Sequence, residues 1–312
     1  WIEQGAKYES HWAFIAPKSP APPQSKTKWG HNPIDNFIAN KLGANGLKPS
    51  PEAAKEILIR RVTFDLTGLP PTLPEVIAFV NDKSPKAYEK VIDRLLASKA
   101  YAERMTLHWM DVARYGDSSV HHADGPRTMW PWRDWVINAY DTNKSFKDFT
   151  IEQIAGDLLP NATVAQKVAT GFNRNHGTTD EGGLIVEEYR VKYVVDRVKT
   201  TGNVWLGLSM ECAQCHSHKY DPISHKEYYQ FFAFFNNNAD SGKQSRGGNA
   251  PPMVNVVSDD QQKLRDSAQA RVKSATTKLA ARKKSAQPDI GKWAVAAALK
   301  NQNQPPEPEG LF

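Results

Sequence analysis

The residues best suited to chemistry are the two cysteines and the histidine of Cys212-Ala213-Gln214-Cys215-His216, a C-x-x-C-H run. In such a run the two thiols can add across the vinyl groups of a haem as thioethers, and the following imidazole can bind the iron as its proximal ligand. The chain has 2 cysteines, and both belong to this run. The motif therefore predicts one covalently attached c-type haem, with His216 as the proximal iron ligand.

Other chemistries could use the same residues. A structural zinc ion takes four ligands, and Cys212, Cys215, His216 and His218 could supply them, although four ligands in so short a stretch are unusually crowded. A thioredoxin-like dithiol needs a βαβ context, which the flanking sequences lack. Zinc binding, a disulfide or free thiols remain alternatives to haem. Because His218 lies so close to His216, we expect it to bond a haem propionate or the adjoining loop.

The histidine best placed to be a distal iron ligand is His108, on a helix predicted over residues 101–115. On a helical wheel Arg104, His108, Asp111 and Tyr115 form a polar stripe beside an apolar one, so the stripe should be partly buried. Asp111 could accept the second ring proton of His108 and raise its basicity, as carboxylates do for metal-bound histidines. The competing prediction is a buried, structural His108–Asp111 pair. Further candidates for the distal ligand are His121, His122 and His176, all in polar loops.

Enzyme chemistry at a haem would need an acid–base pair on the distal side. His108 with Arg104 or Arg114 could serve, and so could His176 with Glu181 in the polar, glycine-rich stretch 173–183. We place electron transfer first. The alternative is a peroxidase- or oxidase-type enzyme that acts on a small or glycan-derived substrate. Carboxylates at positions 180, 181, 187 and 188 also permit a hydrolase or a calcium site. Charge at a helix start and solvation of a loop explain them more simply.

The elements that position these residues are predicted to be helices, which gives an all-α fold. Residues 1–32 are rich in proline and form an irregular N-terminal arm, whose aromatic side chains should pack on the main body. Residues 33–99 form a small helical subdomain, and residues 100–239 form a multi-helix haem-binding body. A Gly- and Pro-rich linker, 240–257, leads to one long basic helix and tail, 258–312.

The composition and the motif limit which partners the protein can have and where in the cell it acts. The net charge of +6 lies largely in the C-terminal helix, whose basic residues can form a solvated face, so we expect no nucleic-acid partner. No apolar run is long enough for a transmembrane segment. The chain starts at Trp1 without a signal peptide and ends in a proline-rich tail, so we expect it to be part of something longer. Covalent haem attachment takes place outside the cytoplasmic membrane, so the motif predicts an extracytoplasmic protein, periplasmic or secreted.

Several motifs occur together along the chain. They are Phe64-Asp65-Leu66-Thr67-Gly68-Leu69-Pro70, Trp132-Arg133-Asp134-Trp135, Ala155-Gly156-Asp157-Leu158-Leu159-Pro160, Glu181-Gly182-Gly183, Asp196-Arg197-Val198 and the C-x-x-C-H run followed by His218-Lys219-Tyr220-Asp221-Pro222-Ile223. In these motifs residues 10–238 resemble a secreted, cytochrome-associated domain family that is abundant in planctomycetes and catalogued as a domain of unknown function. The resemblance implies neighbouring domains in a longer chain, often a cytochrome-c-like one before and an uncharacterised one after. The resemblance does not imply a particular reaction. If the protein transfers electrons, its partners would be the neighbouring domains of the same chain or a separate redox protein.

Overall fold

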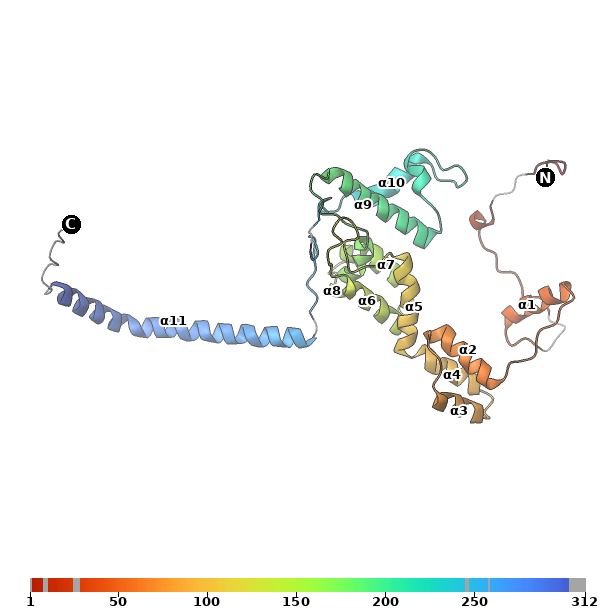
Figure 1. Ribbon diagram of the computed structural model, residues 1–312, viewed down its shortest axis with the longest axis horizontal. Coiled ribbons are helices and arrows are strands. Elements are labelled where there is room, and N and C mark those ends of the chain that lie inside the picture. Colours follow the sequence, from red (N-terminus) through yellow and green to blue (C-terminus); the bar gives the residue numbers. More distant parts are fainter. Residues whose placement is uncertain (1, 8–10, 25–28, 245–246, 258, 303–312) are drawn as a thin grey trace. The chain divides into compact units, whose positions relative to one another are not determined.

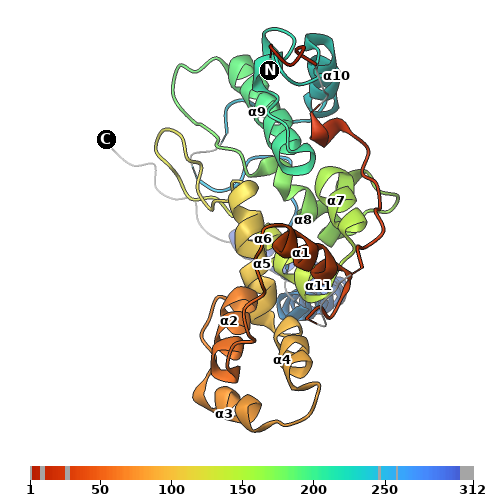
Figure 2. The same ribbon diagram turned by 90° about the vertical axis from the view of Figure 1, so that its right-hand side faces the viewer.

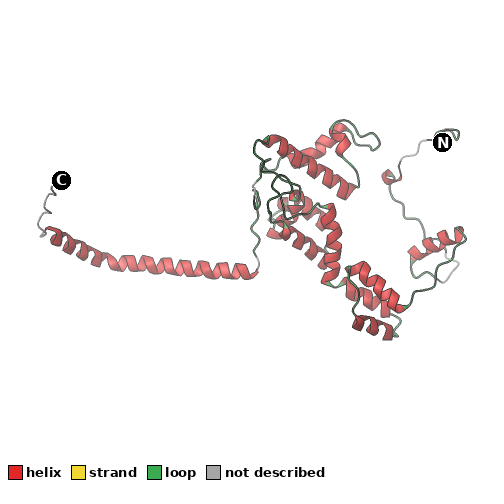
Figure 3. Cartoon of the chain, viewed as in Figure 1, coloured by secondary structure: helices red, strands yellow, loops and turns green. Residues whose placement is uncertain are grey.

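The predicted helices are present in the computed structural model, which describes residues 2–7, 11–24, 29–244, 247–257 and 259–302. Figure 3 shows these residues as helices and loops. The described residues contain no strand. Their only β-type backbone pairing consists of three isolated β-bridges. The all-α prediction is therefore confirmed. The chain divides into two units, Trp1–Leu96 and Ala97–Phe312.

The first unit is built from helices with clear local start and stop residues. Its helices are α1 (Pro33–Ala44), α2 (Lys55–Thr67), α3 (Leu73–Asn81) and α4 (Ala87–Leu96), as labelled in Figure 1. Pro33 fits the first turn of α1, where Asn32 accepts hydrogen bonds from two backbone N–H groups. Gly68 ends α2 in the left-handed conformation, with φ of 69°. The buried core consists of Ile59, Phe79, Ala87, Val91 and Leu95.

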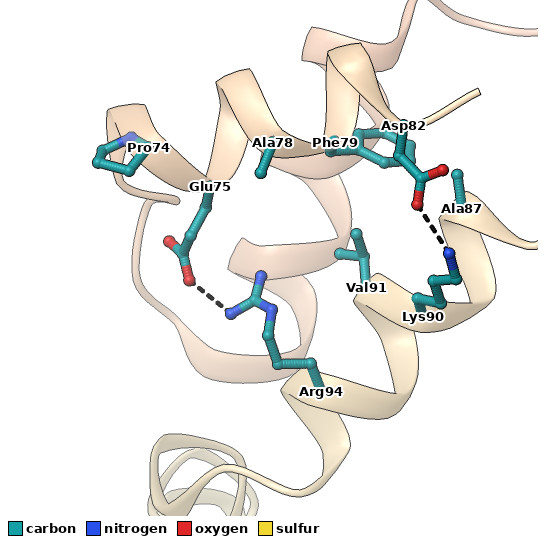
Figure 4. A pocket seen from close by; sticks show the side chains of 9 residues that line it. All are labelled: Pro74, Glu75, Ala78, Phe79, Asp82, Ala87, Lys90, Val91 and Arg94. Atoms are coloured by element: carbon teal, nitrogen blue, oxygen red, sulfur yellow. Dashed lines mark hydrogen bonds and ion pairs between the residues drawn. The ribbon is translucent and has the colours of Figure 1, made fainter. Parts of the chain in front are cut away.

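A groove of about 420 Å³ lies between α3 and α4, over the buried side chains of Phe79 and Val91. Figure 4 shows two ion pairs beside it, Glu75–Arg94 at 2.5 Å and Asp82–Lys90 at 3.0 Å. Hydrogen bonds from Ser84, and then from Lys90, hold the pKa of Asp82 below its usual value. These partly exposed ion pairs join α3 to α4. The charged residues that line the groove therefore have a structural role.

The described aromatic side chains of the N-terminal arm are exposed. Trp12 and Phe14 are 78% and 44% exposed, and Trp29 is 39% exposed. Trp1 and Tyr8, which were expected to pack with them, lie outside the described residues. The prolines do restrict regular structure to a 3-10 turn at Trp12–Phe14 among the described residues before α1. Aromatic content alone indicates a tendency to be buried, but it does not supply a complementary surface.

The second unit contains the helices around the C-x-x-C-H run. They are α5 (Lys99–Val112), α6 (Trp130–Asp141), α7 (Phe146–Ala155), α8 (Val164–Ala169), α9 (Val186–Thr201), α10 (His225–Asn236) and α11 (Asp259–Gln302). One core cluster holds Ala113, Trp132, Val136, Ala139, Phe149 and Phe172. Trp109 packs edge-on against Phe149, with ring centroids 4.9 Å apart. Of the tryptophans that begin α6, Trp132 is therefore part of the core and Trp135 packs against it, whereas Trp130 is 44% exposed.

A second core cluster lies under the C-x-x-C-H run. Helix α9 continues into a π-helical turn, Gly202–Leu206, and the chain reverses at Gly207. A Cβ on Gly202 would lie 2.4 Å from Cγ of Met210, so only glycine allows the chain to return this closely. The cluster consists of Val194, Val198, Met210, Ala213, Tyr228 and Phe235. It packs the run against α9 and α10, which lie side by side in Figures 1 and 2.

The predicted linker 240–257 is not a free linker over its first part. The segment 240–250, of which 240–244 and 247–250 are described, crosses the second unit and is called the strap below. The backbone N–H of Gln244 donates to Thr179 O at 2.9 Å, and that of Gly248 donates to Pro126 O at 2.8 Å. Arg174 Nη2 also donates to Ala250 O at 3.0 Å. Gly and Pro content predicts irregular backbone, but these long-range partners decide that the backbone is docked.

Helix α11 is one continuous helix and agrees with the predicted start near residue 258. The larger apolar side chains along it are exposed, at 71% for Leu264, 66% for Val272 and 55% for Leu279. Among the described helices, none has a stretch both long and apolar enough to cross a membrane.

Candidate functional site

Cys212 lies on a 3-10 turn, Glu211–Gln214, and Cys215 is the residue that caps its end. Side chains three residues apart eclipse one another in a 3-10 turn, so the two thiols share one side of it. Both cysteines are exposed, and both thiols are free. The backbone N–H of Cys215 donates to Cys212 O at 3.4 Å, which closes the turn. The turn therefore presents two adjacent thiols to a ligand outside the protein core.

His216 is exposed and already oriented by a carbonyl group. Its Nδ1 lies 2.8 Å from Ser217 O. A carbonyl oxygen can only accept, so Nδ1 carries the proton and Nε2 keeps a free lone pair. This arrangement, with one ring nitrogen donating to the backbone and the other open, is the one that metal-bound histidines use. The thiols and the imidazole thus fit the donor set of a covalently bound haem.

His218 has a different environment. Its Nδ1 accepts the backbone N–H of Asp221 at 2.8 Å and that of Tyr220 at 3.3 Å. The backbone N–H of His218 in turn donates to Ile223 O at 2.8 Å. This ring therefore organises the 218–223 loop, the second of the two roles predicted for it. In the described part of the chain, His, Cys, Asp and Glu do not assemble into groups of three or more that could hold a metal ion, so the zinc and calcium alternatives gain no support.

The turn is fixed from several sides. Lys199 of α9 pairs with Glu211 at 2.5 Å. His225 Nδ1 donates to Ala213 O at 3.0 Å, and the hydroxyl of Tyr229 donates to Gln214 O at 3.1 Å. Beneath the turn, burial raises the pKa of Tyr228 to about 12, so this side chain stays a neutral phenol. The scaffold holds the backbone of the run rigidly and leaves its reactive atoms outside.

The expected hydrogen bond between His108 and Asp111 is not formed. His108 and Asp111 are both exposed on α5, and within the described chain no hydrogen bond or ion pair joins them. The polar stripe is therefore less buried than predicted, because α5 packs through Trp109 rather than through the neighbouring face. Arg104 is half-buried, and its Nε lacks a hydrogen-bond partner. Arg114 turns to Asp196 of α9, with Nε 2.6 Å from Oδ1.

His176 and Glu181 differ in burial, so they do not form the expected acid–base pair. Glu181 is exposed, whereas His176 is 2% exposed. The imidazole of His176 stacks on Tyr193, with ring centroids 4.5 Å apart. Its Nδ1 donates to Gly177 O at 3.0 Å, and its Nε2 accepts from Arg197 Nη2 at 2.9 Å. Both ring nitrogens are therefore occupied inside the protein.

His176 belongs to a partly to fully buried set of arginine, aspartate and histidine side chains, called the arginine centre below. Its members are Arg114, Arg127, Arg174, Arg197, His176, Asp196 and Asp240. Asp240, 3% exposed in its side chain, forms ion pairs with Arg174 and Arg197. Arg197 Nε donates to Asn173 O at 2.7 Å, and Arg127 Nη1 donates to His176 O at 2.9 Å. The centre joins α9, the 173–176 loop and the strap.

Nothing local predicts these roles for Arg127, Arg174, Arg197 and Asp240. The one available signal is Arg197 itself, a charged residue between Val194 and Val198 on the buried face of α9. The nearby carboxylates at positions 187 and 188 have the simpler role favoured above. They lie in the first turn of α9 and pair with Arg190 and Lys192, each at 2.7 Å.

The stability of the second unit is expected to fall as the pH drops below the ordinary His176 pKa of 6.5, since burial, followed by the charge of Arg197, lowers that pKa in the folded chain. Below pH 6.5 the unfolded chain binds a proton at His176 that the folded chain does not bind. The free energy of unfolding therefore decreases by up to about 1.4 kcal/mol per pH unit. Urea unfolding at several pH values measures the slope. His176→Gln keeps an acceptor for Arg197 but does not titrate, so its slope should be smaller; equal slopes would contradict the expectation.

Comparison with known proteins places this architecture in a family. The PSCyt2 family, described as a protein of unknown function (DUF1549), matches residues 33–240. The matched range covers two thirds of the chain and includes both the C-x-x-C-H turn and the arginine centre. Neither the curated proteins nor the solved structures gave a match. On the extent of the family match, the chain belongs to the PSCyt2 family.

Proposed function

We propose that the second unit carries one haem, bound covalently through Cys212 and Cys215, and transfers electrons outside the cytoplasmic membrane. The observation that carries the proposal is the exposed 3-10 turn, on which two free thiols share one side and His216 follows with its Nε2 open. Each thiol would add its sulfur and hydrogen across one vinyl double bond, which consumes no oxidant. His216 would supply the proximal nitrogen.

Electron transfer is favoured over enzyme chemistry by the surroundings of the turn. When bound, the haem supplies a one-electron couple that a neighbouring domain or a separate redox protein could use. Peroxidase-type chemistry also needs a distal acid–base pair. The candidates for that pair are otherwise engaged or apart: His176 accepts from Arg197, Glu181 is exposed, and Arg114, a candidate partner of His108, pairs with Asp196. Because Cys212, Cys215 and His216 are exposed, a haem attached there would be accessible to a redox partner.

The proposal is tested by producing the chain with a haem-attachment system and measuring its intact mass. We expect the mass of one haem on the parent chain, colour that stays with the polypeptide in acid–acetone, and complete loss of both in Cys212→Ala/Cys215→Ala. Ser217→Ala, an exposed change beside the turn, is the matched control and should keep the haem. An unmodified mass, a mass lower by two hydrogens from a disulfide, or bound zinc would each refute covalent haem.

The electron-carrier assignment has its own test. His216→Ala should keep the thioethers but change the spin state of the iron, because the proximal nitrogen is removed. With the parent protein, cyanide or carbon monoxide should bind slowly or not at all. Rapid binding of either would favour the enzyme alternative instead.

A further inference from the structure

A groove on α9 borders the C-x-x-C-H turn. It has a volume of about 490 Å³ and is lined by Glu187, Glu188, Val191, Lys192, Val195 and Gln214. Gln214 is the second of the two residues between the cysteines of the motif, directly before Cys215. Five of the six lining residues come from one face of α9, and the sixth comes from the motif itself. This set is called the α9 groove.

The α9 groove combines an apolar floor with a charged rim. Val191 and Val195 lie one helical turn apart and are half-buried, so they present adjoining methyl groups. Glu188 and Lys192 pair at 2.7 Å, with side chains 51% and 55% exposed. The ammonium group of Lys192 lies 4.5 Å from the ring centroid of Tyr189. A flat apolar ring system with carboxylate substituents fits such a surface, because its face can cover the valines while a carboxylate meets the ammonium group.

The attachment turn is held beside this surface. The partly exposed Lys199–Glu211 ion pair joins the start of the turn to α9, and the buried Ala213 belongs to one core cluster with Val194 and Val198 of the same helix. Ala213 is buried in the core and Gln214 lines the α9 groove, so Cys215 directly follows a residue of the groove wall. A porphyrin tethered at both cysteines would therefore be attached next to the groove.

We infer that the haem held at Cys212 and Cys215 lies in the α9 groove, with Val191 and Val195 against the porphyrin and Lys192 as the partner of a propionate. This inference rests on the proposed function. It assigns three residues outside the motif to the cofactor site, and it makes α9 the wall that sets the electrostatic environment of the iron.

The test is the reduction potential of the covalently loaded protein at low ionic strength, where screening is weak. A negative charge near the iron stabilises the ferric form, which carries one more positive charge, and so lowers the potential. We expect Lys192→Gln to lower the potential and Glu188→Gln to raise it. Val195→Glu should lower it and Val195→Lys should raise it, each by more than the rim changes, because the floor lies closer to the ring.

Arg133→Gln and Asp134→Asn on α6 form the matched control, since this exposed pair also lies on a helix and is joined at 2.8 Å. Neither control should shift the potential. If the Val195 variants fail to fold, the exposed rim pair still decides the outcome. A chain that carries the haem by mass but shows no shift in the rim variants would overturn the inference alone. A chain without covalent haem would refute the proposed function instead.

Discussion

Asp240→Asn is expected to destabilise the second unit by about 3–5 kcal/mol, because it removes one partner of a buried ion-pair network and leaves the other charges uncompensated. The carboxylate of Asp240 is 3% exposed and accepts from both Arg174 and Arg197. Arg197 is equally buried, and its Nη1 already lacks a hydrogen-bond partner. Loss of the carboxylate would leave two guanidinium groups with one neutral amide between them.

Urea unfolding followed by circular dichroism measures the loss for Asp240→Asn. Glu188→Gln is the control, because it breaks an ion pair whose two side chains are about half exposed, and it should change the midpoint little. If the two variants unfolded at the same urea concentration, the arginine centre would not be a main stabilising element of the second unit.

Gly242→Ala is expected to release the strap. A Cβ at this position would lie 1.8 Å from Val186 O and 2.7 Å from the backbone nitrogen of Arg190. Backbone atoms of a helix cannot rotate away as a side chain could, so the strap itself must move. The buried hydroxyl of Tyr193, which donates to Gly242 O at 2.8 Å, would then lose its acceptor. We expect a loss of about 3 kcal/mol, at the upper end of the usual cost of overpacking.

Limited proteolysis and hydrogen exchange report where the change in Gly242→Ala occurs. The amide of Gln244, which donates to Thr179, should exchange faster in this variant than in the parent. Gly247→Ala is the matched control, because a Cβ there meets nothing within 4 Å. Unchanged exchange at Gln244, together with parent-like stability, would show that the strap tolerates the side chain and is not tightly docked.

The sequence by itself determined the features that depend on neighbours along the chain. Proline at the start of α1, glycine at the end of α2 and a capping box at the start of α10 each act within a few residues, so the helices could be predicted from local pattern. The C-x-x-C-H run is equally local, because two thiols and an imidazole in one turn need no distant partner to be adjacent. The all-α class followed from the same short-range periodicity.

Only the tertiary structure decided which polar residues are buried and what they contact. Arg114 meets Asp196, Arg197 meets Asp240, and His176 meets Arg197 across long sequence separations. By contrast His108 and Asp111, one helical turn apart, remain exposed and unconnected. The helical period indicates which side chains share a face, but burial of that face depends on the element packed against it. A buried charge is stable only when its partner arrives from elsewhere in the fold, and that pairing is not encoded in either local segment.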